Sequence, residues 1–155
     1  MTGDEQASIV GRTVFARTVV AAPPEEVFAL LANPHRHHEF DGSGTVRKAT
    51  SGPERLALGD RFGMDMKIKL PYRVTNRVVE FEPDRRIGWC HPAKAVWRYE
   101  LEPVPGGTRI TETFDYSGSP VAKGMELLGF PKGNAKSIRD TLRRLEETFG
   151  IPAAG

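Results

Sequence analysis

The sequence has only one cysteine, no long apolar run and almost no excess of charge of either sign. Cys90 alone cannot form an intramolecular disulfide, which fits a reducing compartment. No stretch of about 18 apolar residues is present to span a bilayer, and the first residues contain no apolar run of signal-peptide length. Lys and Arg exceed Asp and Glu by 22 − 20 = 2, without runs of like charge. We therefore expect a cytoplasmic protein with no stable membrane insertion and no nucleic-acid partner.

What the sequence does contain is the composition of a folded domain. It has 155 residues, of which 39% are hydrophobic and 27% charged, so it is too apolar for a disordered chain. A chain of this size buries roughly 68–70% of its unfolded surface, which is enough for a core without a metal or disulfide. We predict a flexible polar leader over residues 1–12 and one domain over 13–150.

The N-terminal part of this domain shows a strand signal followed by helix signals. Residues 14–20 are rich in β-branched side chains, as strands are. Pro24 followed by Glu25 and Glu26 is typical of a helix start, because proline needs no amide partner there and carboxylates favour the positive end of the helix dipole. A second short helix is predicted over 34–40.

From residue 45 the hydrophobic period becomes two. Residues 61–69 alternate strictly between apolar and polar side chains, which predicts a strand with one dry and one wet face. Residues 72–82 begin the same way and then change phase near Val79, which indicates a β-bulge or a strong bend. Three further strands are predicted at 85–91, 95–104 and 107–117, which gives about seven in all.

The C-terminal quarter returns to helical spacing. Its apolar residues fall at i, i+4, i+7 and i+11, namely Ile138, Leu142, Leu145 and Phe149. An earlier helical segment around Met125 is interrupted near Pro131, because proline removes a helical hydrogen bond. Strands joined by short turns form an antiparallel sheet, and the final helix is the element long enough to cover its dry face. The fold class is therefore α+β, and a space between the sheet and the helix suits an apolar ligand.

These segments also carry a resemblance to a known family. The stretches concerned are VVAAPPEEVFALLANPHRHHEFDG (19–42), GDRF (59–62), LPYRVTNRVVEFEPDRRIGW (70–89) and WRYELEPVPGGTRITETFDY (97–116), followed by the final helix. Together they resemble the START-like superfamily, also called SRPBCC or polyketide cyclase/dehydrase-like; the helix APPEEVFALLANP and the pair Phe40-Asp41 are the most diagnostic parts. The resemblance implies a helix-grip fold, in which a curved antiparallel sheet of about seven strands wraps around a long C-terminal helix, with two short helices after the first strand. It also implies binding of lipids, sterols, polyketides or other hydrophobic small molecules.

Strand parity then assigns the residues of a candidate ligand site. The inward-facing positions are aromatic rings, flexible thioethers and a few polar groups, which suit a ligand with rings and a few oxygens. The predicted ligand-binding residues are Phe62, Met64, Met66, Tyr72, Trp89, His91, Trp97, Tyr99, Glu112, Phe114, Tyr116 and Met125. The alternative is that most of these side chains simply fill the core.

Two of these residues, His91 and Glu112, are polar groups on the dry side of the sheet. A buried charge must be paired, hydrogen-bonded or neutralised, so the two side chains could pair with each other. Such a pair could act as a catalytic acid and base or could hold the polar end of a ligand. The alternative is that either residue lies near the rim of the sheet and contacts water.

The segment HRHHEF contains His35, His37, His38 and Glu39, which raises the question of a metal site. Their spacing matches no ligand pattern, so we expect a solvated helix surface and predict neither a metal nor a cofactor. Cys90 has the opposite parity from Trp89 and is expected to be inert.

The leading hypothesis is therefore binding or transport of a hydrophobic small molecule in an internal cavity. One alternative is an enzyme of the polyketide cyclase or aromatase type that uses polar residues of the cavity for proton transfer. The other is a protein-interaction module that resembles ubiquinone-binding or chaperone-activator relatives and works through its outer surface. No oligomeric state is predicted.

Overall fold

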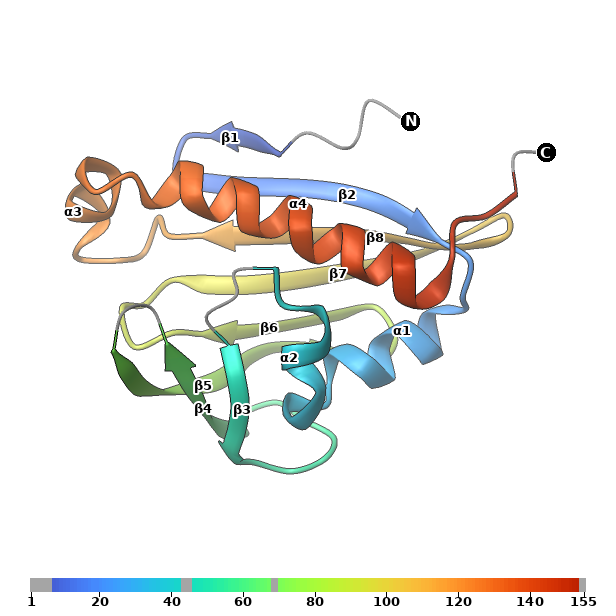
Figure 1. Ribbon diagram of the computed structural model, residues 1–155, viewed down its shortest axis with the longest axis horizontal. Helices are drawn as coiled ribbons and strands as arrows, with labels where there is room; N and C mark the ends of the chain where they lie inside the picture. The colour runs from blue at the N-terminus through green and yellow to red at the C-terminus, as the bar shows by residue number, and fades with distance from the viewer. Residues whose placement is uncertain (1–6, 43–45, 68–69, 154–155) are drawn as a thin grey trace.

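The computed structural model describes residues 7–42, 46–67 and 70–153. Within them one antiparallel sheet of eight strands has the order β1-β2-β8-β7-β6-β5-β4-β3 (Figure 1). The strands are β1 (Ser8–Val10), β2 (Thr13–Val20), β3 (Val46–Ser51), β4 (Arg61–Lys67), β5 (Pro71–Glu82), β6 (Arg86–Cys90), β7 (Val96–Val104) and β8 (Gly107–Asp115). The helices are α1 (Pro24–Leu31), the 3-10 helix η2 (Pro34–Arg36), α2 (His37–Phe40), α3 (Ala122–Leu127) and α4 (Phe130–Phe149). The predicted α+β helix-grip architecture is confirmed.

The strand beyond the predicted seven is β1. It lies inside residues 1–12, the range assigned above to a flexible leader, and pairs with β2 so that Ile9 is opposite Val14. Gly11, at a φ of 58°, turns the chain between the two strands, a conformation that glycine adopts without steric cost. For residues 8–10 the structure thus replaces the leader with an edge strand.

The predicted bulge in β5 is confirmed. The pairing of β5 with β6 shifts in register between Val78 and Glu80. The extra residue leaves Glu80 on the outer face, where it pairs with Arg98, and returns Phe81 to the inner face, where its ring packs edge-on against Phe28.

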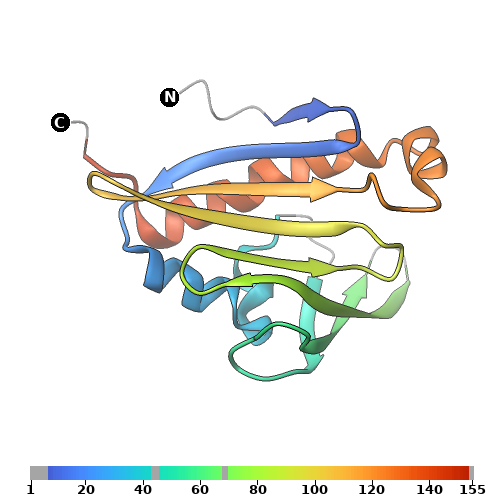
Figure 2. The ribbon, with the colours of Figure 1, turned by 180° about the vertical axis from the view of Figure 1, so that it is seen from behind.

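The helices α1, α2 and α4 lie on one face of the sheet. Figure 1 shows α4, α1 and α2 in front of the strands, and Figure 2, from behind, shows the strands in front of the helices. The apolar stripe predicted for α4 is buried at Ile138, Leu142 and Leu145. Gly129, at a φ of 79°, separates α3 from α4 just before Pro131, where the break was predicted. In the described ranges no helix is both long and apolar enough to cross a membrane.

The segment after α2 packs very closely on α4. The Gly42 amide donates to Thr141 Oγ1 at 2.8 Å, and a Cβ added at Gly42 would come within 2.4 Å of the Thr141 nitrogen. Arg144 Nη1 donates to the Asp41 carbonyl oxygen at 2.8 Å. These contacts hold the end of α2, and with it Asp41, against the helix that covers the sheet.

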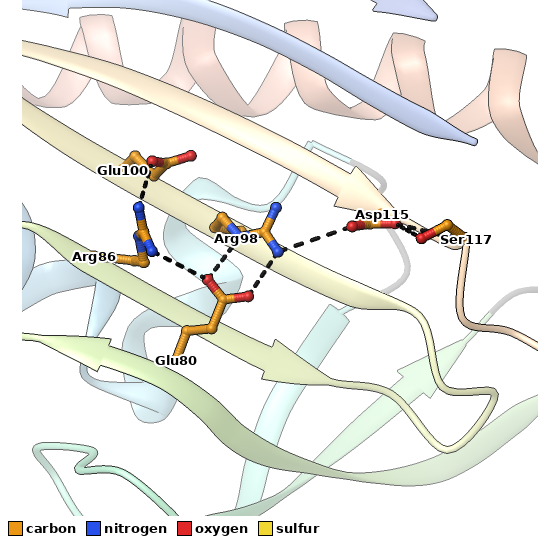
Figure 3. Close-up of polar contacts among 6 residues, drawn as sticks. All are labelled: Glu80, Arg86, Arg98, Glu100, Asp115 and Ser117. Carbon is orange, nitrogen blue, oxygen red and sulfur yellow. Dashed lines mark hydrogen bonds and ion pairs between the residues drawn. The ribbon is translucent and has the colours of Figure 1, made fainter. Parts of the chain in front are cut away.

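The opposite face of the sheet carries charged side chains (Figure 3). Arg98 on β7 donates to both carboxylate oxygens of Glu80 on β5, at 2.7 and 2.6 Å. The residue between them on β6 is Gly88, whose lack of a side chain lets the two meet across that strand. Arg86 extends the network to Glu100 at 3.1 Å. The outer face is therefore a solvated ion-pair surface, and the apolar side chains of the sheet face the helices.

Candidate functional site

Adjacent strands bring the predicted site residues together in rows on the inner face. Trp89 is opposite Trp97, and Trp97 is opposite Phe114. In the next row Tyr99 is opposite Glu112. The predicted residues that are buried are Phe62, Met64, Trp89, Tyr99, Glu112, Phe114 and Tyr116. The inward parity therefore holds for them, while their role in ligand binding stays a prediction.

The other predicted site residues are more accessible. Met66, Trp97 and Met125 are half-buried and pack against the core. Tyr72 is opposite Met66 across the β4–β5 pair and is 38% exposed. His91 is half-buried in the turn after β6. Their role in ligand binding also stays a prediction.

The polar centre of the inner face is a pair formed by Tyr99 and Glu112. Tyr99 Oη donates to Glu112 Oε2 at 2.9 Å, whereas Glu112 Oε1 is buried and has no hydrogen-bond partner among the described residues. Burial is the main cause that raises the pKa of the Glu112 carboxyl well above its ordinary value, and the charge of Asp41 adds to it. Burial, followed by the nearby Glu112, also raises the pKa of Tyr99 well above its ordinary value. The environment therefore favours the protonated form of both groups.

Asp41 brings a second carboxylate toward this pair. It follows α2, and its charge is felt by both Tyr99 and Glu112. In the sequence Asp41 is part of the Phe40-Asp41 motif and is not among the predicted site residues. The structure joins the motif to the inner face, because Phe40 packs edge-on against Tyr99 with ring centroids 6.1 Å apart.

An aromatic cluster surrounds the pair on the side of α2. The His37 imidazole stacks on Trp89 with centroids 4.7 Å apart, and Phe62 meets both rings edge-on. Trp89 in turn lies 5.6 Å from Tyr99. Trp97 and Phe114, in the same row of the sheet as Trp89, pack against each other with ring centroids 4.7 Å apart. The Tyr99–Glu112 pair thus lies among large flat apolar surfaces.

The prediction of a solvated helix surface for the histidine cluster is wrong for His37. Its side chain is buried, and His37 Nε2 donates to the Leu31 carbonyl oxygen at 2.8 Å. His35 and His38 are exposed as predicted. Within the described ranges no three His, Cys, Asp or Glu side chains are grouped to hold a metal ion.

The suggested pairing of His91 with Glu112 is also wrong. Glu112 Oε2 accepts a hydrogen bond from Tyr99, and Glu112 Oε1 has no partner in the described ranges, which include His91. His91 Nδ1 instead accepts from the Ala93 amide at 3.1 Å, within its own turn. The hydrogen bond within the turn therefore accounts for the polar contact of His91. Glu112, the acid of the inner face, is not part of that contact.

A groove of about 440 Å³ lies over a different region, the charged outer face. Its walls are mainly arginines and glutamates from β2, β5, β6, β7 and β8, such as Arg17, Arg109 and Glu102. Arg109 Nη1 and Glu102 Oε2 form an ion pair at 2.9 Å. The groove is open and polar, so it does not correspond to the predicted apolar site.

Comparison with known proteins identifies relatives for most of the chain. The family model described as "Polyketide cyclase / dehydrase and lipid transport" matches residues 12–150. An uncharacterized protein of Mycobacterium tuberculosis, Rv0088, is 44% identical over 136 residues, which are 84% of this chain and 61% of that protein. The chain thus spans about three fifths of the length of the curated relatives it matches.

Solved structures share the fold at low sequence identity. A crystal structure of a Rhodobacter sphaeroides protein has a TM-score of 0.71 at 19% identity, covering 92% of this chain and 95% of that one. The AHSA1-like protein of Aeromonas hydrophila has a TM-score of 0.59 at 18% identity, covering 88% and 93%. At these identities the likeness shows a common helix-grip fold.

Proposed function

The chain belongs to the polyketide cyclase/dehydrase and lipid transport family, and from that premise we propose that it binds a hydrophobic small molecule between the inner face of its sheet and α4. The observation that carries this proposal is the buried Tyr99–Glu112 pair, in which Glu112 Oε1 has no hydrogen-bond partner in the part of the chain that the structure describes. Folded proteins satisfy nearly all buried polar groups, so an unsatisfied one needs an explanation. A ligand that binds beside it supplies one.

The surroundings of the pair support an apolar ligand. Rings and thioethers line the inner face, and contact with them would contribute about 25 cal/mol for each Å² of apolar surface removed from water. The half-buried Met66, Trp97 and Met125 offer the more accessible approach to the buried floor. Thioether side chains adapt their shape to an incoming molecule at little cost.

Native mass spectrometry of the purified protein, followed by extraction and a titration with the recovered compound, tests this proposal. We expect a bound apolar molecule, and we expect Trp97→Ala to weaken its binding because part of the aromatic wall is lost. Thr111→Ala, on the outer face of the neighbouring strand β8, is the matched control. If no compound from a broad hydrophobic library binds, the carrier function is wrong.

A second candidate function, a protein-interaction module, has one observation in its favour. Val121, Leu127, Leu128 and Phe130 are exposed together around the junction of α3 and α4, Leu127 being 87% exposed and Leu128 77%. Clustered exposed apolar side chains are typical of binding surfaces. Replacement of both leucines by serine separates the two functions, because it would abolish partner binding and leave the affinity of a buried small molecule nearly unchanged.

A further inference from the structure

We infer that the Tyr99–Glu112 pair donates a hydrogen bond to the carbonyl oxygen of a neutral apolar ligand, and that the interior discriminates against carboxylates. This inference rests on the proposed function, because it names the chemical class of the molecule bound between the sheet and α4. It separates ketones, quinones and esters from fatty acids and other organic anions.

The Tyr99–Glu112 pair offers more hydrogen-bond donors than it uses internally. Tyr99 carries one O–H donor and a protonated Glu112 carries another, but a single hydrogen bond joins them, from Tyr99 Oη to Glu112 Oε2 at 2.9 Å. With Oε2 serving as the acceptor, the proton of a neutral carboxyl group would lie on Oε1, which is buried and has no hydrogen-bond partner among the described residues. The pair therefore has one donor left over, and a carbonyl oxygen is the complementary group.

The charges around the pair disfavour an anion. Asp41 contributes negative charge to the environment of the pair. The buried polar side chains of the described residues include no lysine or arginine, and burial lowers the pKa of His37 to about 4, so it is neutral at pH 7. A ligand carboxylate would thus enter a low-dielectric interior beside a like charge, with no buried lysine or arginine of the described residues to pair with, which is strongly unfavourable.

The neighbours of Glu112 in the sheet are a small side chain on one side and aromatic rings on the other. In the row that holds Glu112, one neighbour is Tyr99 and the other is Ala16 on β2. Ala16 has no side chain beyond Cβ, so on that side the carboxyl faces no bulky neighbour from the sheet. Flat aromatic surfaces lie close by at Trp89 and Phe40. The donor is therefore placed to fix the oxygen of a molecule whose rings contact these side chains.

A matched series of probes tests the inference at pH 7: 2-acetylnaphthalene as the neutral ketone, 2-naphthoate as the carboxylate, 2-ethylnaphthalene as the hydrocarbon and 2-(aminomethyl)naphthalene as the cation. Affinities come from titration calorimetry. We expect the ketone to bind at least tenfold more tightly than the carboxylate, and about fivefold more tightly than the hydrocarbon, as one neutral hydrogen bond predicts. The infrared C=O stretch of the bound ketone should move to lower frequency, since hydrogen bonding weakens that bond.

Variants of Glu112 test whether this side chain causes the preference for the ketone over the hydrocarbon. Glu112→Leu should abolish the roughly fivefold advantage of the ketone over the hydrocarbon and remove the infrared shift. Glu112→Gln, which still offers an N–H donor, should keep most of both and provides the test if the leucine variant does not fold. Glu100→Gln, on the outer face of β7, is the matched control and should behave like the wild type.

The outcomes are distinguishable. If no probe binds, the inference fails together with the proposed function. If the hydrocarbon or the carboxylate binds as tightly as the ketone, the protein is a carrier but the inference is wrong. Tightest binding of the cationic amine would also overturn it, because Glu112 and Asp41 would then act as an anionic site.

Discussion

His37 is neutral in the folded protein because its imidazole is buried between rings, and this state has a measurable consequence for stability. Burial lowers its pKa from 6.5 to about 4. Below pH 6.5 the unfolded chain binds a proton that the folded chain does not, so stability falls as the pH drops toward 4. The loss is roughly 3 kcal/mol for a shift of this size.

Urea unfolding between pH 7 and pH 4 measures this loss. The stability of the wild type should decrease more steeply with acidification than that of His37→Gln, which cannot titrate at this position. His38→Gln changes an exposed histidine beside it and should keep the slope of the wild type. Equal slopes for all three proteins would mean that His37 is protonated in the folded state.

Glu112 has the opposite pH dependence. Burial raises its pKa well above the ordinary value, so above about pH 4.5 the unfolded chain releases a proton that the folded chain keeps. The stability associated with this group is complete at acidic pH and decreases as the pH rises, by up to about 1.4 kcal/mol per pH unit.

We therefore expect Glu112→Gln to gain stability relative to the wild type between pH 5 and pH 8, measured by the same unfolding experiment. Glu100→Gln on the outer face supplies the comparison, because its carboxylate is accessible to water. A stability difference between Glu112→Gln and the wild type that does not vary with pH would show that Glu112 is ionised in the fold.

The sequence indicated the inward direction of Tyr99 and Glu112 but gave the wrong partner for Glu112. Alternation along a strand shows which face a residue occupies, whereas the cross-strand partner depends on register. Only the register places Tyr99 opposite Glu112. His37 was missed for a related reason, because a helical segment as short as 34–40 has no repeated apolar spacing from which to identify its buried face.

At the scale of elements, the contact between the end of α2 and α4 depends on Gly42. A Cβ at this position would come within 2.6 Å of the Ser137 carbonyl oxygen and within 2.4 Å of the Thr141 nitrogen, both backbone atoms of a helix. Such atoms cannot move without shifting α4. Gly42→Ala should therefore lower the free energy of unfolding by about 2 kcal/mol or more.

The matched control is Gly124→Ala in α3, where an added Cβ has no neighbour within 4 Å. This change should be neutral or stabilise by up to about 1 kcal/mol, because alanine favours helix. Thermal and urea unfolding of both variants tests the pair of expectations. A Gly42→Ala protein as stable as the wild type would show that α2 does not pack on α4 so closely.

Most elements were predictable because they repeat a pattern over many residues. The strict alternation predicted for 61–69 corresponds to the strand β4 (Arg61–Lys67), with residues 68 and 69 outside the described ranges. The change of phase near Val79 corresponds to a bulge, and the apolar stripe of the last helix to the buried face of α4. The strand β1 was not, since three residues are too few to show alternation. Its pairing with β2 through the turn at Gly11 stabilises it.

At the scale of the whole molecule, the protein separates its chemistry between two faces of one sheet. Ion pairs cover one face (Figure 3), and the helices cover the other (Figure 1), which carries rings, thioethers and the Tyr99–Glu112 pair. Short turns made the neighbouring strands from β4 to β8 predictable. The pairing of β2 with β8 joins distant parts of the chain, and hydrophobic period alone carries no information about such a contact.

Binding of a small molecule on the inner face beneath α4 can be detected at the methionine methyl groups. The sequence has four methionines, of which Met64, Met66 and Met125 belong to the candidate site. In the protein with ¹³C-labelled methionine methyl groups, saturating 2-acetylnaphthalene should give intermolecular nuclear Overhauser effects to Met64 and Met125. Binding without any such contact to these methyl groups, with shifts confined to the outer groove around Arg17 and Arg109, would contradict the account.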